Sequence, residues 1–123
     1  MTHSKNKSLS TRLGFALAGI AHAARHERSV RTQLFATLLV LALLAWRRPE
    51  PLWWALCALA IGGVLAAEML NTALERLADH LHPEQHPHVR IVKDCAAGGV
   101  LLASLAALVV GAALLVHLFA GRA

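Results

Sequence analysis

Charged and aromatic residues are both scarce in this chain of 123 residues. Only 15% of the residues are charged and 5% are aromatic, with no tyrosine, whereas 57% are hydrophobic. Soluble domains carry about 25% charged residues, so this composition excludes an ordinary soluble globular protein. The length is sufficient for one domain.

Several features that mark familiar protein classes are missing. The chain has two cysteines, Cys57 and Cys95, and we expect both to be buried, free thiols because antiparallel spans would hold them at opposite depths. No GxxxxGK(S/T) phosphate loop and no signature of a soluble kinase occurs. The first strongly apolar stretch begins only near Thr32, so a cleaved signal peptide is not expected either.

Charge is absent from three long stretches, residues 32–46, 51–67 and, apart from His117, 95–121. A membrane-spanning helix needs about 20 residues, and the first stretch is short for this. Its flanking arginines can extend along the helix to the membrane interface and make up the difference. We therefore predict an all-α membrane protein with spans over residues 29–47, 51–79 and 94–120.

The N-terminal part is predicted to differ from the spans. Residues 1–8 are polar and are expected to be disordered. Residues 9–26 carry Leu9, Leu13 and Leu17 at helical spacing, which predicts an amphipathic helix on the membrane surface. Packing of this helix on the bundle is equally compatible with the pattern. Residues 9–121 would then form a single membrane domain.

The net charge of +5 comes from basic residues that do not form a patch large enough for nucleic acid. Six of the twelve precede the first span, and the loop after the second span carries more, which predicts that both segments are cytoplasmic. Tryptophans bracket the opposite turn, as in an interfacial aromatic belt. The basic residues in question are Lys5, Lys7, Arg12, Arg25, Arg28 and Arg31, then Arg76, Arg90 and Lys93.

An acidic stripe follows the charge-free part of the second span. Glu68, Asn71, Glu75 and Asp79 fall within an arc of about 80° on one helix face. Glu68 lies about 25 Å from Pro51 along a helix, close to the boundary of the bilayer, where lipid hydroxyl groups are found. An acid at the edge of a membrane span is a functional-site candidate by default.

The stripe suits phosphoryl transfer from a nucleotide to a lipid alcohol. Glu68 is placed to act as general base, and Glu75, two turns further on, to hold Mg²⁺ together with phosphate oxygens. Lys93 would neutralise phosphate charge. Two alternatives stay open on the residues alone: pairing of Glu68 and Glu75 with arginines of a neighbouring helix in an assembly protein, and proton coupling by Glu68 in a small transporter.

Simpler interpretations exist for the other polar residues. Glu27 lies among three arginines and could form a surface ion pair, and Asp94 could cap the third span. Residues 80–88 contain four histidines that could bind a transition metal. Their two prolines prevent a regular ligand face, so a solvated loop is favoured.

Three motifs nevertheless resemble those of the prokaryotic diacylglycerol kinase family, which includes undecaprenol kinases. They are EMLNTALE at residues 68–75, followed by Asp79; KD with AAG over residues 93–98; and ERSVR at residues 27–31. The resemblance covers residues 9–120. It implies small homotrimers in the bacterial inner membrane, each subunit with a surface helix and three spans, and active sites shared between subunits on the cytoplasmic side.

The resemblance also implies roles for individual residues in an ATP- and Mg²⁺-dependent reaction. Glu68 matches the catalytic base and Asn71 the amide beside it. Glu27 and Glu75 match the acids that hold the metal ion and its nucleotide. Lys93 and Asp94 match a pair that contacts the nucleotide. Glu84 and His86 lie in the loop that approaches ATP. The substrate is expected to be diacylglycerol, with undecaprenol as the alternative. Phe15 and His26 depart from the diacylglycerol-kinase branch, which usually has Tyr and often Asn there.

Overall fold

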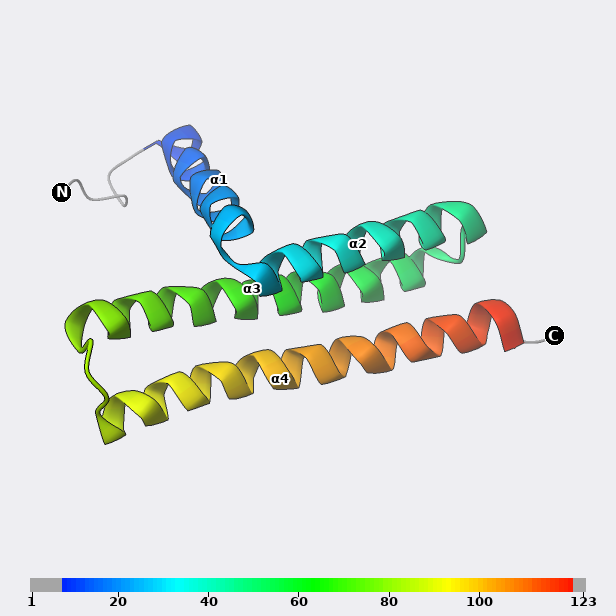
Figure 1. Cartoon of the computed structure of the whole chain (residues 1–123). Helices are drawn as coiled ribbons and strands as arrows, with labels where there is room; N and C mark the ends of the chain where they lie inside the picture. The colour runs from blue at the N-terminus through cyan, green and yellow to red at the C-terminus, as the bar shows by residue number, and fades with distance from the viewer. Residues whose placement is uncertain (1–7, 121–123) are drawn as a thin grey trace.

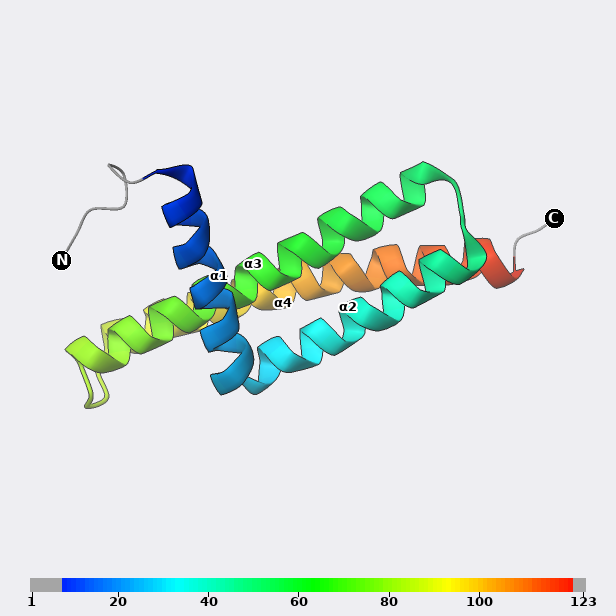
Figure 2. The same cartoon turned by 90° about the horizontal axis from the view of Figure 1, so that it is seen from above.

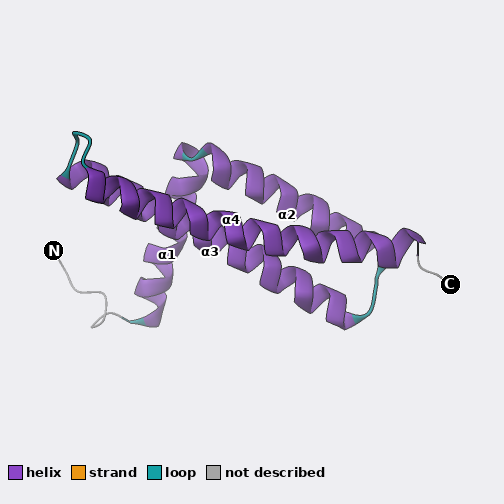
Figure 3. Cartoon of the chain, turned by 90° about the horizontal axis from the view of Figure 1, so that it is seen from below, coloured by secondary structure: helices purple, strands orange, loops and turns teal. Residues whose placement is uncertain are grey.

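The structure is a computed structural model that describes residues 8–120, and this range is entirely helical apart from short connections (Figure 3). This confirms the predicted all-α fold. Of residues 1–8, which are predicted to be disordered, residues 1–7 lie outside the described residues, while Ser8 is described as the cap of α1. The elements are α1 (Leu9–His26), α2 (Arg28–Arg47), α3 (Pro51–Leu81), α4 (Pro87–Leu115) and a terminal π-helical turn, η2 (Val116–Ala120).

Three helices are long and apolar enough to cross a membrane: Arg28–Arg47, Pro51–Leu81 and Pro87–Ala120. The third begins at Pro87, ahead of the predicted start near residue 94, and the His86 side chain caps it by accepting a hydrogen bond from the His88 N–H at 3.1 Å. The prediction that Asp94 is a cap is therefore wrong. The prediction placed the start of the helix at the beginning of the apolar stretch, near residue 95. The helix in fact includes the preceding polar residues, because no helix-breaking residue lies between Pro87 and the apolar stretch.

The three long helices run side by side, with α2 and α4 pointing the same way and α3 running against them (Figures 1 and 2). The most extensive contacts join α3 to α4. α1 projects from the bundle and crosses α3 (Figure 2), because the backbone at Glu27 is extended, with φ −116° and ψ 116°. This single extended residue separates α1 from α2.

Local sequence explains where the helices begin and end. Ser8 caps α1 with its side chain, which accepts a hydrogen bond from the Thr11 N–H. Arg48 adopts a left-handed conformation, φ 49°, that ends α2, and Pro51 occupies the first turn of α3, where its missing N–H costs nothing. α3 has 31 residues and is therefore about 46 Å long, longer than the roughly 30 Å core of a bilayer. α3 is therefore longer than an upright crossing of that core needs.

The core within one chain is small. Leu44, Cys57 and Leu114 form a buried cluster near the α2–α3 turn, while large apolar side chains such as Leu59 remain exposed. Large exposed apolar surfaces of this kind are typical of proteins that contact lipid or other protein chains. Both cysteines are free, as predicted, but only Cys57 is buried, and Cys95 is exposed, contrary to the prediction.

A set of contacts, here called the turn clasp, ties η2 to the α2–α3 turn. Arg47 donates a hydrogen bond to the Leu118 carbonyl at 2.8 Å and lies 4.6 Å from the centre of the Phe119 ring. The His117 ring stacks on Trp53 and is 3.0 Å from a Glu50 carboxylate oxygen. The pKa of Glu50 is lowered by its own backbone hydrogen bond and by His117, so this acid stays ionised and available to His117.

We expect Arg47→Gln to destabilise the fold by about 1–3 kcal/mol, because it removes a charge-assisted hydrogen bond and the contact with the Phe119 ring. Arg48→Gln is the matched control, because Arg48 is the neighbouring arginine and is exposed. Its side chain forms no hydrogen bond to any residue in the range 8–120. Thermal unfolding in detergent, followed by circular dichroism, compares the two. Equal unfolding temperatures would show that the clasp contributes nothing.

Candidate active site

Glu68 is the one buried acid of the described chain, with 4% of its surface exposed. Its Oε1 atom accepts a hydrogen bond from Ser29 Oγ at 3.0 Å, which joins α3 to the first turn of α2. Within residues 8–120, no lysine or arginine pairs with Glu68. The alternative in which an arginine of the same chain neutralises Glu68 therefore finds no support, and the carboxylate keeps one oxygen free for another donor.

Asn71 lies one turn further along α3. Its Oδ1 atom is buried and has no hydrogen-bond partner in the part of the chain that the structure describes. Buried acceptors are satisfied in the great majority of cases, so an orphan beside a buried acid marks a place where a ligand, a metal or water completes the structure. Glu68 Oε2 and Asn71 Oδ1 thus both lack a hydrogen-bond donor among the described residues, and Asn71 Oδ1 is also buried.

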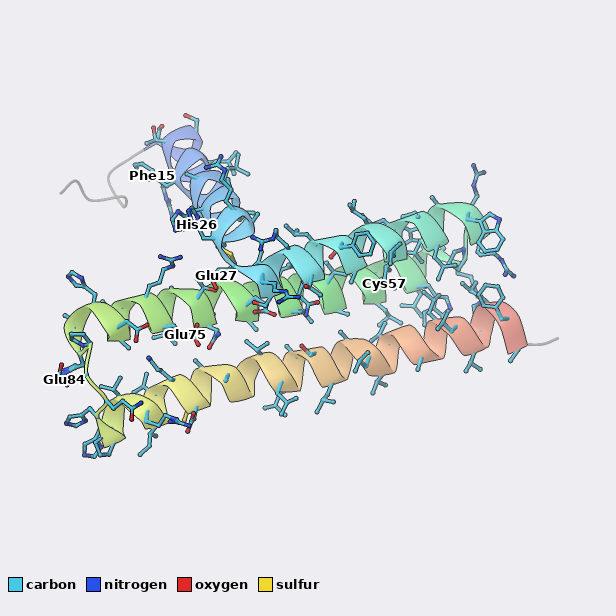
Figure 4. The ribbon with its side chains drawn as sticks, in the orientation of Figure 1. Phe15, His26, Glu27, Cys57, Glu75 and Glu84 are labelled. Carbon is cyan, nitrogen blue, oxygen red and sulfur yellow. The ribbon has the colours of Figure 1, made fainter. Side chains whose placement is uncertain are left out.

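Glu27 faces α3 from the junction between α1 and α2. Its Oε2 atom is 3.2 Å from Arg76 Nη2, and 26% of its side chain is exposed. The predicted local pairing with nearby arginines is not observed, since the Arg31 guanidinium donates instead to the carbonyl oxygens of Ala24 and Arg25. Figure 4 shows Glu27 and Glu75 at a similar level along α3 but on different sides of it, with Glu27 at the α1–α2 junction and Glu75 on the side of α4. Within the single chain, the two predicted metal ligands therefore approach α3 from different sides.

Two further ion pairs lie nearer the α3–α4 loop. The Lys93 ammonium group pairs with the Asp79 carboxylate and so ties α4 to α3. Asp94 pairs with Arg90 at 3.2 Å on the exposed face of α4. The predicted pair Lys93–Asp94 is thus split between two faces, and Lys93 alone points into the space between the helices.

A cavity of about 490 Å³ lies between the ends of α3 and α4 and the loop that joins them. Such a volume is typical of a small-molecule site. Glu84, His86 and Lys93 all line it, so the structure brings these three predicted nucleotide contacts together. The remaining lining residues are Asp79, His82, Pro83, Gln85, Pro87, Val89 and Arg90.

The histidine loop does not form a metal site of its own. The rings of His82, His86 and His88 follow one another with centroids 5.7 and 5.6 Å apart. In the range 8–120, however, no three His, Cys, Asp or Glu side chains are placed to share an ion. His86 Nδ1 is already engaged as the cap of α4. Residues 80–88 are exposed, as expected for a solvated loop.

A second cavity, of about 670 Å³, lies between α2, α3 and α4. Gln33 and Val64 line it, and each lies one turn from a partner of the Ser29–Glu68 hydrogen bond. From there the cavity extends toward the α2–α3 turn along mainly apolar side chains such as Leu114. An apolar cavity therefore begins next to the buried acid.

Sequence reasoning missed Ser29 and did not single out Arg76. Ser29 lies two residues after Glu27, but nothing in the local pattern shows that its hydroxyl reaches α3. Arg76 is one of several basic residues near the loop, and its pairing with Glu27 depends on the register between α2 and α3. Both contacts join residues far apart in the sequence.

The comparisons with known proteins agree with the motifs. The family described as "Prokaryotic diacylglycerol kinase" matches residues 14–115. A diacylglycerol kinase of Synechocystis sp. is 38% identical over 102 residues, which cover 82% of this chain and 58% of that protein. An undecaprenol kinase of Bacillus subtilis is 33% identical over 93 residues, 76% of each chain. A diacylglycerol kinase of Escherichia coli is 26% identical over 96 residues, 78% of this chain and 79% of that protein.

Proposed function

Since the chain belongs to the prokaryotic diacylglycerol kinase family, we propose that it transfers the γ-phosphoryl group of ATP to the hydroxyl group of a membrane lipid alcohol. Diacylglycerol is the proposed substrate and phosphatidic acid the product. The observation that carries the proposal is Glu68, which is buried and bonded to Ser29 about 25 Å along α3, at the depth where lipid hydroxyls lie.

Glu68 acts as the general base. The lipid hydroxyl donates its hydrogen bond to the carboxylate oxygen that Ser29 leaves free, and its proton passes to Glu68 as the alcohol oxygen attacks the γ-phosphorus. The bond between the γ-phosphorus and the bridging oxygen then breaks and ADP departs. A positioned carboxylate of this kind accelerates proton transfer by about 10²–10⁴-fold.

The nucleotide is proposed to approach through the cavity at the α3–α4 loop. Lys93 exchanges Asp79 for phosphate oxygens, which is inexpensive because the side chain of Asp79 is 63% exposed and such ion pairs contribute little. Glu84 and His86 line the same cavity and are placed to contact the nucleotide beyond its phosphates. Asp94 is proposed to contact the nucleotide together with Lys93, since its exposed ion pair with Arg90 is equally easy to exchange.

The oxygen donors present here fit magnesium. Mg²⁺ favours one or two carboxylates together with phosphate oxygens and water, and Glu27 and Glu75 supply two carboxylates at a similar level of α3. The orphan Oδ1 atom of Asn71 is a further neutral oxygen donor on the same helix. When bound, the ion supplies positive charge that offsets the charge of the phosphates. Arg76, which pairs with Glu27, is released by such binding.

The apolar cavity between α2, α3 and α4 suits the hydrocarbon part of a lipid. It begins about one helical turn from Glu68, at Gln33 and Val64, so an alkyl chain lying in it would direct the attached hydroxyl toward the base. Lining residues such as Val64 and Leu114 offer no charge to an alkyl chain. This arrangement favours a lipid alcohol over a soluble one.

We further propose that the protein is a homotrimer in the bacterial inner membrane, with the α3–α4 loop on the cytoplasmic side, where ATP is available. The basic residues at that end support the orientation. Exposed apolar side chains along the spans, such as Leu59 and Leu102, support contact with lipid and with further copies. Surface helix α1 lies at the membrane interface in this arrangement.

Reconstitution in bilayers with γ-labelled ATP tests the proposal. Diacylglycerol and undecaprenol are offered in separate vesicles, and label is expected in the lipid extract with diacylglycerol. Label with undecaprenol alone would assign the alternative substrate, which similarity to the Bacillus subtilis undecaprenol kinase favours. The absence of label with both lipids would contradict kinase activity on these substrates.

A further inference from the structure

Ser29 lies within the ERSVR motif of residues 27–31, but the family resemblance assigns no role to its hydroxyl group. We propose that Ser29 is a positioning residue: its hydroxyl fixes one carboxylate oxygen of Glu68, so that the other oxygen faces the substrate alcohol. The inference depends on the proposed role of Glu68 as base. It adds a requirement for a hydroxyl group at residue 29.

The place of Ser29 in the chain explains why its hydroxyl points across to α3. Hydroxyl side chains within helices commonly donate to the carbonyl four residues earlier, as Thr32 does to Arg28 and Thr37 to Gln33. For Ser29 that carbonyl belongs to Arg25, which lies in α1 and accepts from Arg31 at 2.9 Å. With no local acceptor within its own helix, the Ser29 hydroxyl donates to Glu68 instead.

The first turn of α2 is itself held against α3. Val30 is 1% exposed, and Glu27 pairs with Arg76 at 3.2 Å. Ser29 lies between these two anchors, so its hydroxyl approaches Glu68 from a fixed direction. An anchored donor can orient a flexible side chain, whereas a freely moving donor would only follow it.

Orientation matters here because a glutamate side chain rotates about three bonds. A hydrogen bond to Oε1 leaves Oε2 as the oxygen that can accept the proton of a bound alcohol. Holding the base in reacting geometry before the substrate arrives removes part of the entropic barrier. Ser29 therefore acts on turnover through Glu68, without touching the substrate.

The test compares Ser29→Ala and Ser29→Thr in the full-length protein in bilayers, with Thr32→Ala as matched control. Thr32 lies on the same helix, but its hydroxyl donates to its own backbone. We expect Ser29→Ala to lower kcat about 10- to 100-fold, the range for a lost hydrogen bond to a charged group, with KM for ATP within about twofold. Ser29→Thr should recover most of kcat, and Thr32→Ala should match the wild type.

Isotope-edited infrared spectroscopy of labelled glutamate provides a readout that needs no activity. The carboxylate stretch assigned to Glu68, by its loss in Glu68→Gln, should shift in Ser29→Ala and return in Ser29→Thr. This separates the two inferences: a shift without any lipid kinase activity in the wild type would contradict the proposed function but support the contact. If Ser29→Ala fails to fold, Ser29→Cys, a weaker donor, should give an intermediate kcat. An unchanged stretch, or wild-type kcat in Ser29→Ala or Ser29→Cys, would overturn the role of Ser29.

Discussion

Glu68→Gln is expected to abolish lipid phosphorylation while leaving the fold intact. The glutamine oxygen still accepts the hydrogen bond from Ser29, but the amide cannot take a proton from the lipid hydroxyl. The rate should fall by a factor of about 100 or more, the contribution of a positioned general base. The measurement is transfer of labelled phosphate from ATP to lipid at saturating substrate, with circular dichroism and thermal unfolding as checks on the fold.

Glu50→Gln is the matched control for this experiment. Glu50 is an acid directly before α3 and lies in the turn clasp, at the opposite end of the bundle from the α3–α4 loop. It should therefore retain the phosphorylation rate of the wild type. Retained lipid labelling in Glu68→Gln would rule out its role as base. Loss of labelling in both variants would point to a general effect of acid removal on the membrane domain.

Glu75→Gln is expected to weaken the magnesium dependence of the reaction or remove activity. The substitution takes one of two proposed carboxylate ligands away, and an amide oxygen is a poorer ligand for a hard dication. We expect the Mg²⁺ concentration for half-maximal rate to rise about tenfold or more, in line with the effect of disturbing a metal's ligand environment. A titration of rate against Mg²⁺ at fixed ATP measures it.

Binding of Mn²⁺ in the presence of ATP, followed by electron paramagnetic resonance, gives an independent reading of the same site. Glu75→Gln should bind the ion more weakly than the wild type and than Glu50→Gln. Glu27→Gln is less simple to read, because it also releases Arg76 from its ion pair. If Glu75→Gln leaves both the magnesium titration and Mn²⁺ binding unchanged, the metal assignment is wrong.

The spans were predictable because they depend on local properties of the chain. The length of a charge-free stretch and its helical periodicity can both be recognised from neighbouring residues. As a result, α2 and α3 lie within a few residues of the predicted ranges. The start of α4 was not predicted. Its polar first turns contain no apolar signal, and the cap at His86 depends on a loop conformation rather than on a recognisable motif.

The acidic stripe was also predictable as a helical face, but the environments of its members were not. Glu68 is buried where α2 covers α3, whereas Asp79 is exposed beyond the start of α2 and meets Lys93 from α4. Periodicity places side chains on one face and says nothing of what faces them. The neighbouring helices therefore determine that Glu68 is placed as a base, whereas Asp79 is an ion-pair partner.

The amino-acid sequence by itself determined that this is a helical membrane protein of the prokaryotic diacylglycerol kinase family, since hydropathy and motif spacing are properties of the chain in order. Only the tertiary structure decided that Ser29 meets Glu68, that Arg76 meets Glu27, and that Asn71 keeps an unsatisfied oxygen. Such contacts join residues distant in sequence. Their register depends on how whole helices pack, which no local pattern records.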